Sequence, residues 1–298
     1  MSPDAMYSSA EQQAIREDLF RWLDRRLEFG TYEFAREELL GYTYDGVRIP
    51  LLDTSRGIRN PREFDATLSI MTSSQGPYDD AVTDDGFVHY RYQSRDGGDN
   101  RKLKRAHELG VPLVYFHGVR PGVFVATYPV YVIADDEANR TFLIALDDSL
   151  RFFGDPLHMS DHERRYGERM ARQRLHQPLF RARVIHAYAN TCTVCHLKHP
   201  ELLDAAHIVA DSDPNGIATV PNGLTLCKMH HAAYDRNLMG ISADYIVHIN
   251  DGLLHEVDGP MLKHGLQEMH GRRIELPQRR ADYPSKERLD ERFLAFDR

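Results

Sequence analysis

The sequence predicts an α+β protein in which a barrel-like β domain with flanking helices precedes a smaller, zinc-stapled domain. Its 298 residues are enough for two domains, each with a hydrophobic core of its own. Between residues 42 and 148 the apolar side chains alternate with a period of two, which is typical of strands. All three cysteines lie within residues 192–227 among several histidines, which indicates metal ligation rather than disulfides.

The composition is that of an ordinary globular protein, with 42% hydrophobic and 28% charged residues. No run of eighteen apolar residues occurs, and the N-terminus lacks the basic and then apolar pattern of a signal peptide, so we expect a cytoplasmic protein with no membrane partner. A net charge of −8 is unusual for a protein that binds nucleic acid, although the local pattern of charge matters more than the sum.

The first half of the chain is expected to begin with a helix over residues 8–29, where Ser8 and Glu11 have the spacing of a capping box. Pro129 indicates an edge or a bulge in the strand that contains it, and residues 120–122 (Arg-Pro-Gly) are typical of a hairpin turn. The other elements expected in this half are a helix at 100–109 and strands at 64–69, 88–92, 112–119, 123–134 and 142–146.

Residues 155–185 are expected to form an arginine-rich helical linker, which Pro178 divides in two. A solvated surface helix is the plain interpretation of such a run of charge. The scarcity of acids and the position just ahead of the cysteines favour contact with phosphate groups instead. The arginines with this predicted role are Arg164, Arg165, Arg169, Arg172, Arg174, Arg181 and Arg183.

The last part of the chain is expected to hold a hairpin over residues 241–256 with its turn at Asn250-Asp251-Gly252. A short helix is expected at 260–269, followed by a charged terminus. No internal repeat and no low-complexity linker occurs in the sequence.

The cysteines are spaced as zinc ligands, in one Cys-x2-Cys pair and one Cys-x2-His pair. Four protein ligands would leave no open position on the ion, so this zinc would be structural. Buried, unliganded cysteines are the alternative, which the two-residue spacings disfavour. His196 and His199 lie close enough in sequence to replace the histidine named here as fourth ligand. The expected ligands are Cys192, Cys195, Cys227 and His230.

Further polar residues lie between and just after these pairs, as Asp204-Ala-Ala-His207, Asn222-Gly-Leu and His231. Each taken alone has an ordinary explanation, as a core histidine, a turn or packing beside the zinc. In this order they resemble the HNH endonuclease family, the ββα-metal group, in the branch with an acid three residues before the first histidine. The resemblance covers about residues 186–240.

This resemblance implies an HNH endodeoxyribonuclease that uses a divalent metal. His207 would be the general base, Asn222 the family's middle asparagine and His231 its closing histidine, and Asp204 and His231 would bind a catalytic Mg²⁺ or Mn²⁺. The chemistry agrees, because phosphodiester hydrolysis needs a base that activates water and a hard cation that stabilises the charge developing on the phosphate. A histidine, with a reference pKa of about 6.5, suits the base role.

One departure from the family pattern concerns the acid. Many members have His or Asp directly before the catalytic histidine, where this chain has Ala206. Asp204 is therefore a ligand by inference from its branch, and a different acid could take its place. Asp235, one helical turn after His231, is a candidate, with capping as its ordinary alternative.

The front domain resembles, loosely, the PUA and SRA superfamily of modified-base readers, which often precede HNH modules. This implies three regions: a helix plus recognition domain (1–154), the linker (155–185) and the nuclease domain with a C-terminal extension (186–298). Readers of this kind flip a base and stack it on aromatic side chains. Tyrosines on strands are more often packing residues. The residues named for the pocket are Tyr78, Asp79, Tyr90 and Tyr92.

The expected function is a restriction or defence enzyme that cuts modified or foreign double-stranded DNA. A less selective defence nuclease or toxin with a ligand-sensing front domain is one alternative, and a zinc-containing DNA-binding module without catalysis is another. One active site cuts one strand, so double-strand cleavage would favour a homodimer.

Overall fold

The computed structural model describes residues 7–28, 32–53, 57–73, 86–93, 98–152, 159–213 and 215–296. The chain divides into two compact units, named here unit 1 (Met1–Pro178) and unit 2 (Leu179–Arg298). The division falls inside the segment predicted as a linker.

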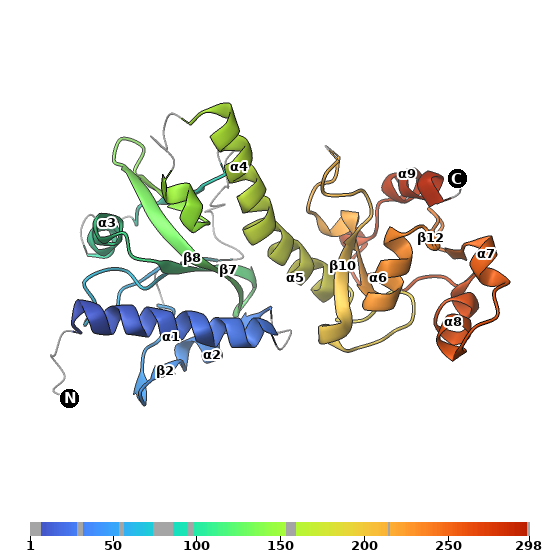
Figure 1. Cartoon of the computed structure of the whole chain (residues 1–298), viewed down its shortest axis with the longest axis horizontal. Coiled ribbons are helices and arrows are strands. Elements are labelled where there is room, and N and C mark those ends of the chain that lie inside the picture. Colours follow the sequence, from blue (N-terminus) through green and yellow to red (C-terminus); the bar gives the residue numbers. More distant parts are fainter. Residues whose placement is uncertain are drawn as a thin grey trace. The chain divides into compact units, whose positions relative to one another are not determined.

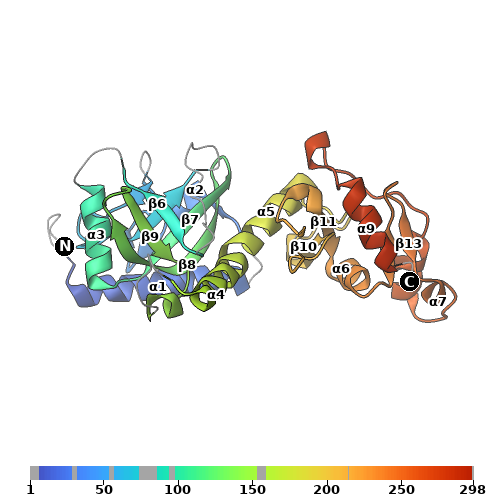
Figure 2. The same ribbon diagram turned by 90° about the horizontal axis from the view of Figure 1, so that it is seen from above.

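Unit 1 is built on one curled, mixed sheet that forms a half-barrel (Figures 1 and 2). Its strands are β1 (Phe34–Ala35), β4 (Ile58–Arg59), β5 (Ser69–Thr72), β6 (Val88–Arg91), β7 (Leu113–Arg120), β8 (Val123–Asp136) and β9 (Thr141–Ala145). Their order is β4-β5-β7-β8-β9-β6, with β1 added beside β8, and β5 and β7 run parallel while the other neighbours run antiparallel. A small separate hairpin joins β2 (Thr43–Tyr44) and β3 (Val47–Arg48).

Strand β8 links the two parts of this sheet because it changes partner along its length. Its residues up to Val130 pair with β7, and those from Tyr131 onward pair with β9. Pro129 lies at the change, opposite an irregularity in the pairing with β7. Proline has no N–H for a ladder, so a bulge is a position that tolerates it. The bulge predicted at Pro129 is confirmed.

Helix α1 (Ser9–Glu28) covers one face of the sheet. Its Ile15, Leu19 and Leu23 pack in one core with Val114 and Phe116 of β7. The predicted capping box is present, because the Ser8 N–H donates to Glu11 (2.7 Å) and the Glu11 N–H donates to the Ser8 hydroxyl (3.3 Å). A short helix, α2 (Arg36–Leu40), follows β1.

A second core lies between the sheet and the helical segments that follow β9. It holds Phe87, Tyr131 and Ala145, with Tyr166 and Met170 of α4 (Asp161–Ala171) packed against it. Helix α3 (Asp99–Leu109) precedes β7 and ends at Gly110, which has a left-handed φ of 61°. The short η1 (Asp148–Phe152) lies between β9 and α4 in the chain.

The strand expected at 64–69 is wrong except at its last residue, where β5 begins. Side chains from two helices donate to backbone carbonyls of residues 64–67, whereas Leu68 already bonds to Arg59 of β4 and Val114 of β7. Arg16 of α1 donates to the carbonyl of Thr67 (2.8 Å), and Lys102 of α3 donates to that of Phe64 (2.6 Å). Phe64 is fully buried, so the apolar pattern reported burial in the core and not a strand.

The arginine-rich segment is helical from Asp161 onward, as α4, a π-helical turn η2 (Arg172–His176) and α5 (Gln177–Ala187). The division predicted at Pro178 is therefore wrong. Proline cannot donate to the carbonyl four residues earlier, which belongs to Arg174. The Thr127 hydroxyl donates to that carbonyl instead (3.2 Å), and the widened π turn accommodates the ring.

Unit 2 places a β-hairpin against helix α6 (Lys228–Asp235). The hairpin pairs β10 (Leu203–His207) with β11 (Gly223–Cys227), and a second hairpin pairs β12 (Met239–Ile241) with β13 (Val247–Ile249). Its core includes Val184 of α5 together with Leu224, Leu226 and Tyr234. The other elements are η3 (Pro200–Leu202), η4 (Val220–Asn222), α7 (Asp251–Leu254), α8 (Pro260–Gly265), η5 (Gln267–Met269), η6 (Arg280–Asp282) and α9 (Lys286–Phe296).

The second hairpin differs from the prediction in its turn. The chain reverses at residues 242–246, and Asn250 instead caps α7 by accepting the N–H of Gly252 (3.0 Å). An Asn-Asp-Gly sequence serves a helix start as well as a hairpin turn, which is why the pattern misled. None of the helices within the described ranges combines bilayer-spanning length with a sufficiently apolar sequence.

Candidate metal centre and active site

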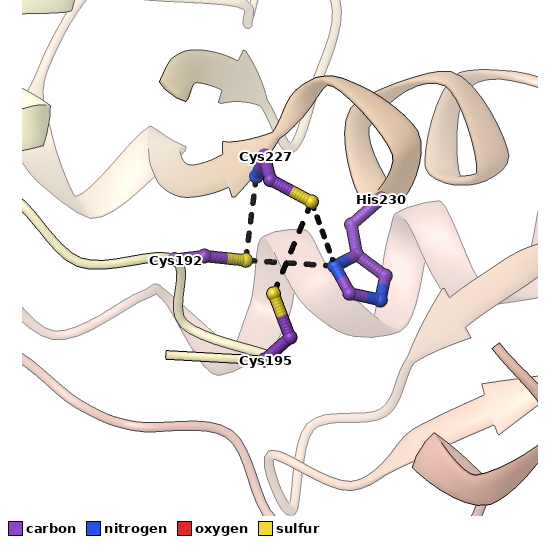
Figure 3. Close-up of side chains that lie close together, drawn as sticks. All are labelled: Cys192, Cys195, Cys227 and His230. Carbon is purple, nitrogen blue, oxygen red and sulfur yellow. Dashed lines mark hydrogen bonds between the residues drawn. The ribbon is translucent and has the colours of Figure 1, made fainter. Parts of the chain in front are cut away.

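Three cysteines and one histidine converge in unit 2, as Figure 3 shows. The sulfurs of Cys195 and Cys227 lie 3.9 Å apart, and His230 Nδ1 lies 3.1 Å from the sulfur of Cys227 and 3.5 Å from that of Cys192. A tetrahedral zinc ion with bonds of about 2.3 Å to sulfur and 2.0 Å to nitrogen places its ligand atoms about 3.5–3.8 Å apart. The four side chains could therefore hold a zinc ion.

The surroundings of the group prepare its members as ligands. His230 Nε2 lies 2.7 Å from the carbonyl of Gly265, so that nitrogen donates and Nδ1 keeps the lone pair that a metal needs. The N–H of Cys227 donates to the sulfur of Cys192 (3.3 Å), and contacts with Cys195 and Cys227 lower the pKa of Cys192. Among the described residues, the fourth member of the group is His230. The two alternatives, His196 and His199, are exposed and do not belong to it.

Close packing around the glycine of Asn-Gly-Leu, Gly223, leaves no room for a larger residue. A Cβ on Gly223 would lie 2.4 Å from Val184 and 2.9 Å from Phe180, since α5 packs directly on the start of β11. This close packing sets the hairpin on α5 and so places the end of β10.

Asp204 of β10 and His231 of α6 face each other, with Asp204 Oδ2 3.3 Å from His231 Nδ1. Two donors on neighbouring corners of an octahedral cation with bonds of about 2.1 Å lie about 3 Å apart, so this pair fits a hard divalent cation. The contact with His231, helped by Lys228, lowers the pKa of Asp204 to about 2 in spite of partial burial. The same contact raises the pKa of His231.

A second carboxylate approaches the other side of the His231 ring. Asp235 Oδ2 lies 3.4 Å from His231 Nε2, and its side chain is largely exposed. Because the two acids contact opposite nitrogens, Asp204, His231 and Asp235 do not converge on one point. Among the residues that the structure describes, three or more possible metal ligands come together at the cysteine and histidine group and not at these acids.

His207 ends β10, where it pairs with Gly223 of β11. Its ring stacks on Phe180, with centroids 3.9 Å apart and planes at 14°. Its Nε2 is buried and has no hydrogen-bond partner among the described residues. Burial lowers the pKa of His207, against an opposing effect of Asp211, so the ring is neutral at pH 7. A neutral imidazole with an unpaired nitrogen is able to accept a proton.

Asn222 is fully buried and holds the loop that follows His207. Its Oδ1 accepts from the N–H of Val209 (2.9 Å), and its Nδ2 donates to the carbonyls of Val209 (3.0 Å) and Ile217 (3.1 Å). These three bonds all go to loop backbone. Of the two roles that an asparagine here could have, the geometry favours fixing the loop over orienting the His207 ring.

The predicted DNA-binding arginines fall into two groups. Two are partly buried and hold the fold: Arg174 pairs with Asp147 (3.0 Å), and Arg181 donates to the carbonyl of Leu203 (2.8 Å). The exposed ones are Arg164, Arg165, Arg169, Arg172 and Arg183.

Two cations beside Asp204 were missed from the sequence as parts of its surroundings. Lys228 Nζ lies 2.6 Å from Asp204 Oδ1, and Arg181 Nε lies 4.0 Å from the same atom. The available signal was the position of Lys228, which directly follows Cys227 of the cysteine and histidine group and starts the helix that carries His231.

The tyrosines named for a base pocket are placed as packing residues where they can be described. Tyr90 is only 3% exposed, and its hydroxyl donates to the carbonyl of Met71 (3.3 Å). Tyr92 stacks on Phe142 with centroids 4.6 Å apart. The burial of Tyr90 argues against an open pocket at that residue, and a role of the half-buried Tyr92 stays a prediction. Tyr78 and Asp79 lie outside the described residues.

A pocket of about 240 Å³ lies elsewhere in unit 1, beside the turn between β7 and β8. The guanidinium of Arg36 lies 5.5 Å from the ring centre of Phe124, and Arg120 is paired with Glu33 (2.7 Å). An aromatic ring with guanidinium groups suits a planar or anionic group. Its other lining residues are Met71, Ser73, Gly118, Pro121 and Gly122.

Comparison with known proteins gives one family match and two similar structures. Residues 192–242 match the HNH endonuclease family. The "Modification dependent TagI restriction endonuclease" is 15% identical over 82% of this chain and 86% of that chain, with a TM-score of 0.30. The "Type IV phosphorothioation-dependent restriction endonuclease ScoMcrA" is 15% identical over 66% and 59%, with a TM-score of 0.23.

Likeness at these TM-scores does not establish a shared fold, so neither structure supports an assignment here. The comparison with curated proteins found no match. The family match covers the zinc group and all four residues that the sequence singled out around it. Residues 192–242 are thus similar to the HNH endonuclease family, in agreement with the resemblance seen in the sequence.

Proposed function

We propose that this protein is a metal-dependent DNA endonuclease that hydrolyses phosphodiester bonds at its HNH motif. The observation that carries this proposal is the approach of Asp204 to His231 at 3.3 Å within the matched segment. A carboxylate and an imidazole suit a hard cation such as Mg²⁺ or Mn²⁺ and leave positions for water and phosphate. When bound, the cation would stabilise the negative charge that develops on the phosphate.

The protein's own residues would supply the base and its support. His207 accepts the proton of the attacking water, because burial keeps its ring neutral and stacking on Phe180 holds it in place. Asn222 fixes the loop after it. The zinc group ties Cys227 and His230 to the preceding turn, which sets the start of α6 and with it His231.

We assign phosphate contact to the exposed arginines of α4, η2 and α5. Replacing Arg165 and Arg183 together with alanine is expected to weaken DNA binding and to reduce the slope of log K against log salt by about 2, one unit for each lost phosphate contact. Binding measured by fluorescence anisotropy at several salt concentrations checks this.

Arg174→Ala is the matched control, since Arg174 pairs with Asp147 and is only 23% exposed. We expect it to lower the thermal stability of unit 1 and to leave the salt slope unchanged. An unchanged slope in the double variant would contradict the assignment.

We infer that the front part of the chain, residues 1–154, directs the nuclease to modified or foreign DNA in restriction or defence. The curled half-barrel sheet is compatible with the PUA or SRA resemblance, and the pocket lined by Arg36 and Phe124 has a size and chemistry that suit a nucleobase or a small anion. The pocket would equally serve a less selective defence nuclease whose front part senses a ligand.

The test compares matched plasmids that are unmodified or carry 5-methylcytosine, 5-hydroxymethylcytosine or phosphorothioate, each with Mg²⁺ or Mn²⁺. We expect faster cleavage of at least one modified plasmid. Equal cleavage of all four would reject modified-DNA targeting and favour the less selective nuclease. No cleavage under any condition would count against the nuclease itself.

A further inference from the structure

Lys228 occupies an unusual place for a surface lysine. It is the first residue of α6, and its Nζ lies 2.6 Å from Oδ1 of Asp204, while its side chain is 57% exposed. An ion pair this exposed contributes little to folding stability, because water and salt screen it. Its effect falls instead on the carboxylate, whose other oxygen faces His231.

Two positively charged side chains, Lys228 and Arg181, approach Oδ1 of Asp204, and they differ in conformational freedom. Arg181 is held by the backbone, since its guanidinium donates to the carbonyls of Pro200 (3.2 Å) and Leu203 (2.8 Å). Lys228 has a flexible stem and a compact ammonium, so it is the cation that is able to leave. Contacts with His231 and Lys228 also hold the pKa of Asp204 at about 2, so the acid is ionised throughout the neutral range.

We propose that Lys228 competes with the catalytic divalent cation for Asp204, so that loading of the metal displaces the ammonium. This rests on the proposed function, in which Asp204 and His231 are the metal ligands. A cation shared by Asp204 Oδ2 and His231 Nδ1 would stand roughly 4–5 Å from an ammonium that remained on Oδ1. The two positive charges repel each other at that distance, so the ammonium leaves, and the loss of this exposed ion pair corresponds to about a threefold loss of metal affinity at low salt.

The experiment measures Mn²⁺ binding to the zinc-loaded, full-length protein without DNA, by electron paramagnetic resonance of the free ion at low salt. We expect Lys228→Met to bind Mn²⁺ about threefold more tightly than the unaltered protein. Lys228→Gln should show the same tightening, and Lys228→Arg, which keeps the charge, should not.

Lys286→Met is the matched control, because Lys286 is 56% exposed and also pairs with an aspartate, Asp244 (3.6 Å), outside the active site. We expect it to leave Mn²⁺ affinity unchanged. Unchanged or weaker binding in both Lys228→Met and Lys228→Gln would overturn the competition.

Asp204→Asn separates this failure from failure of the proposed function. If Asp204→Asn loses Mn²⁺ binding while Lys228→Met leaves it unchanged, the metal site stands and the competition is rejected. If Asp204→Asn binds Mn²⁺ like the unaltered protein, Asp204 is no ligand, and both proposals are rejected.

Discussion

Replacing His207 with alanine is expected to slow DNA cleavage by about 10²–10⁴-fold, the usual contribution of a general base. DNA binding and zinc content should not change, because His207 is neither one of the exposed arginines nor a member of the cysteine and histidine group. Single-turnover cleavage of a plasmid, binding by electrophoretic shift and zinc by atomic absorption check the three quantities. Cleavage at the original rate would show that His207 is not the base.

The pH dependence of the unaltered enzyme gives a second measure of the same residue. Burial lowers the pKa of His207 below its ordinary value of about 6.5, so the ring becomes protonated, and the base is lost, only at a more acidic pH. The acidic fall of the rate should therefore have its midpoint below pH 6.5. His199→Ala is the matched control for both measurements, since His199 is an exposed histidine near the zinc group.

Removing the zinc is expected to unfold the region around α6 and to abolish cleavage. The group joins the turn at Cys192 and Cys195 to the end of β11 and the first turn of α6, and structural zinc sites of this kind bind with about 10 kcal/mol or more. Cys227→Ser should lose zinc and melt at a lower temperature, as followed by near-ultraviolet circular dichroism.

The tyrosines in the core of unit 2, Tyr188, Tyr234 and Tyr245, provide the signal for that measurement. His199→Ala again serves as the control and should keep both zinc and melting temperature. Full zinc content and unchanged melting in Cys227→Ser would exclude this group as the structural site.

The HNH motif could be predicted because its residues are ordered by short-range geometry. Cys227 and His230 are brought together by the first turn of one helix, and a hairpin with five-residue strands sets Asp204 opposite the strand that leads into that helix. Spacing alone therefore predicts which side chains share a neighbourhood. It does not predict that Lys228 takes the free oxygen of Asp204, because that contact depends on a rotatable side chain.

The front unit could be predicted only in outline. A pattern of apolar residues indicates which side chains are buried, but not which groups form hydrogen bonds with the backbone. Residues 64–67 alternate like a strand, yet Arg16 donates to the carbonyl of Thr67 and Lys102 donates to that of Phe64. Tyr90 lies on a predicted strand that does form, and only the curl of the sheet decides that its side chain faces the core. The spacing of neighbouring residues predicts neither the contact with Arg16, which belongs to a helix distant in sequence, nor the curl of the sheet.

The buried Asn222 also protects the chain from a chemical change. Asparagine followed by glycine is prone to deamidation, because glycine has no Cβ to hinder attack of its own backbone nitrogen on the asparagine amide. Here that nitrogen donates to the carbonyl of Val220, and the amide is held by Val209 and Ile217, so the native state keeps the reacting atoms apart. Deamidation of Asn222 should therefore accumulate only in molecules that have unfolded, and the aspartate or isoaspartate it leaves cannot donate to the loop. Loss of this asparagine would thus require transient opening of the loop in unit 2, and each molecule that reacts would be changed irreversibly.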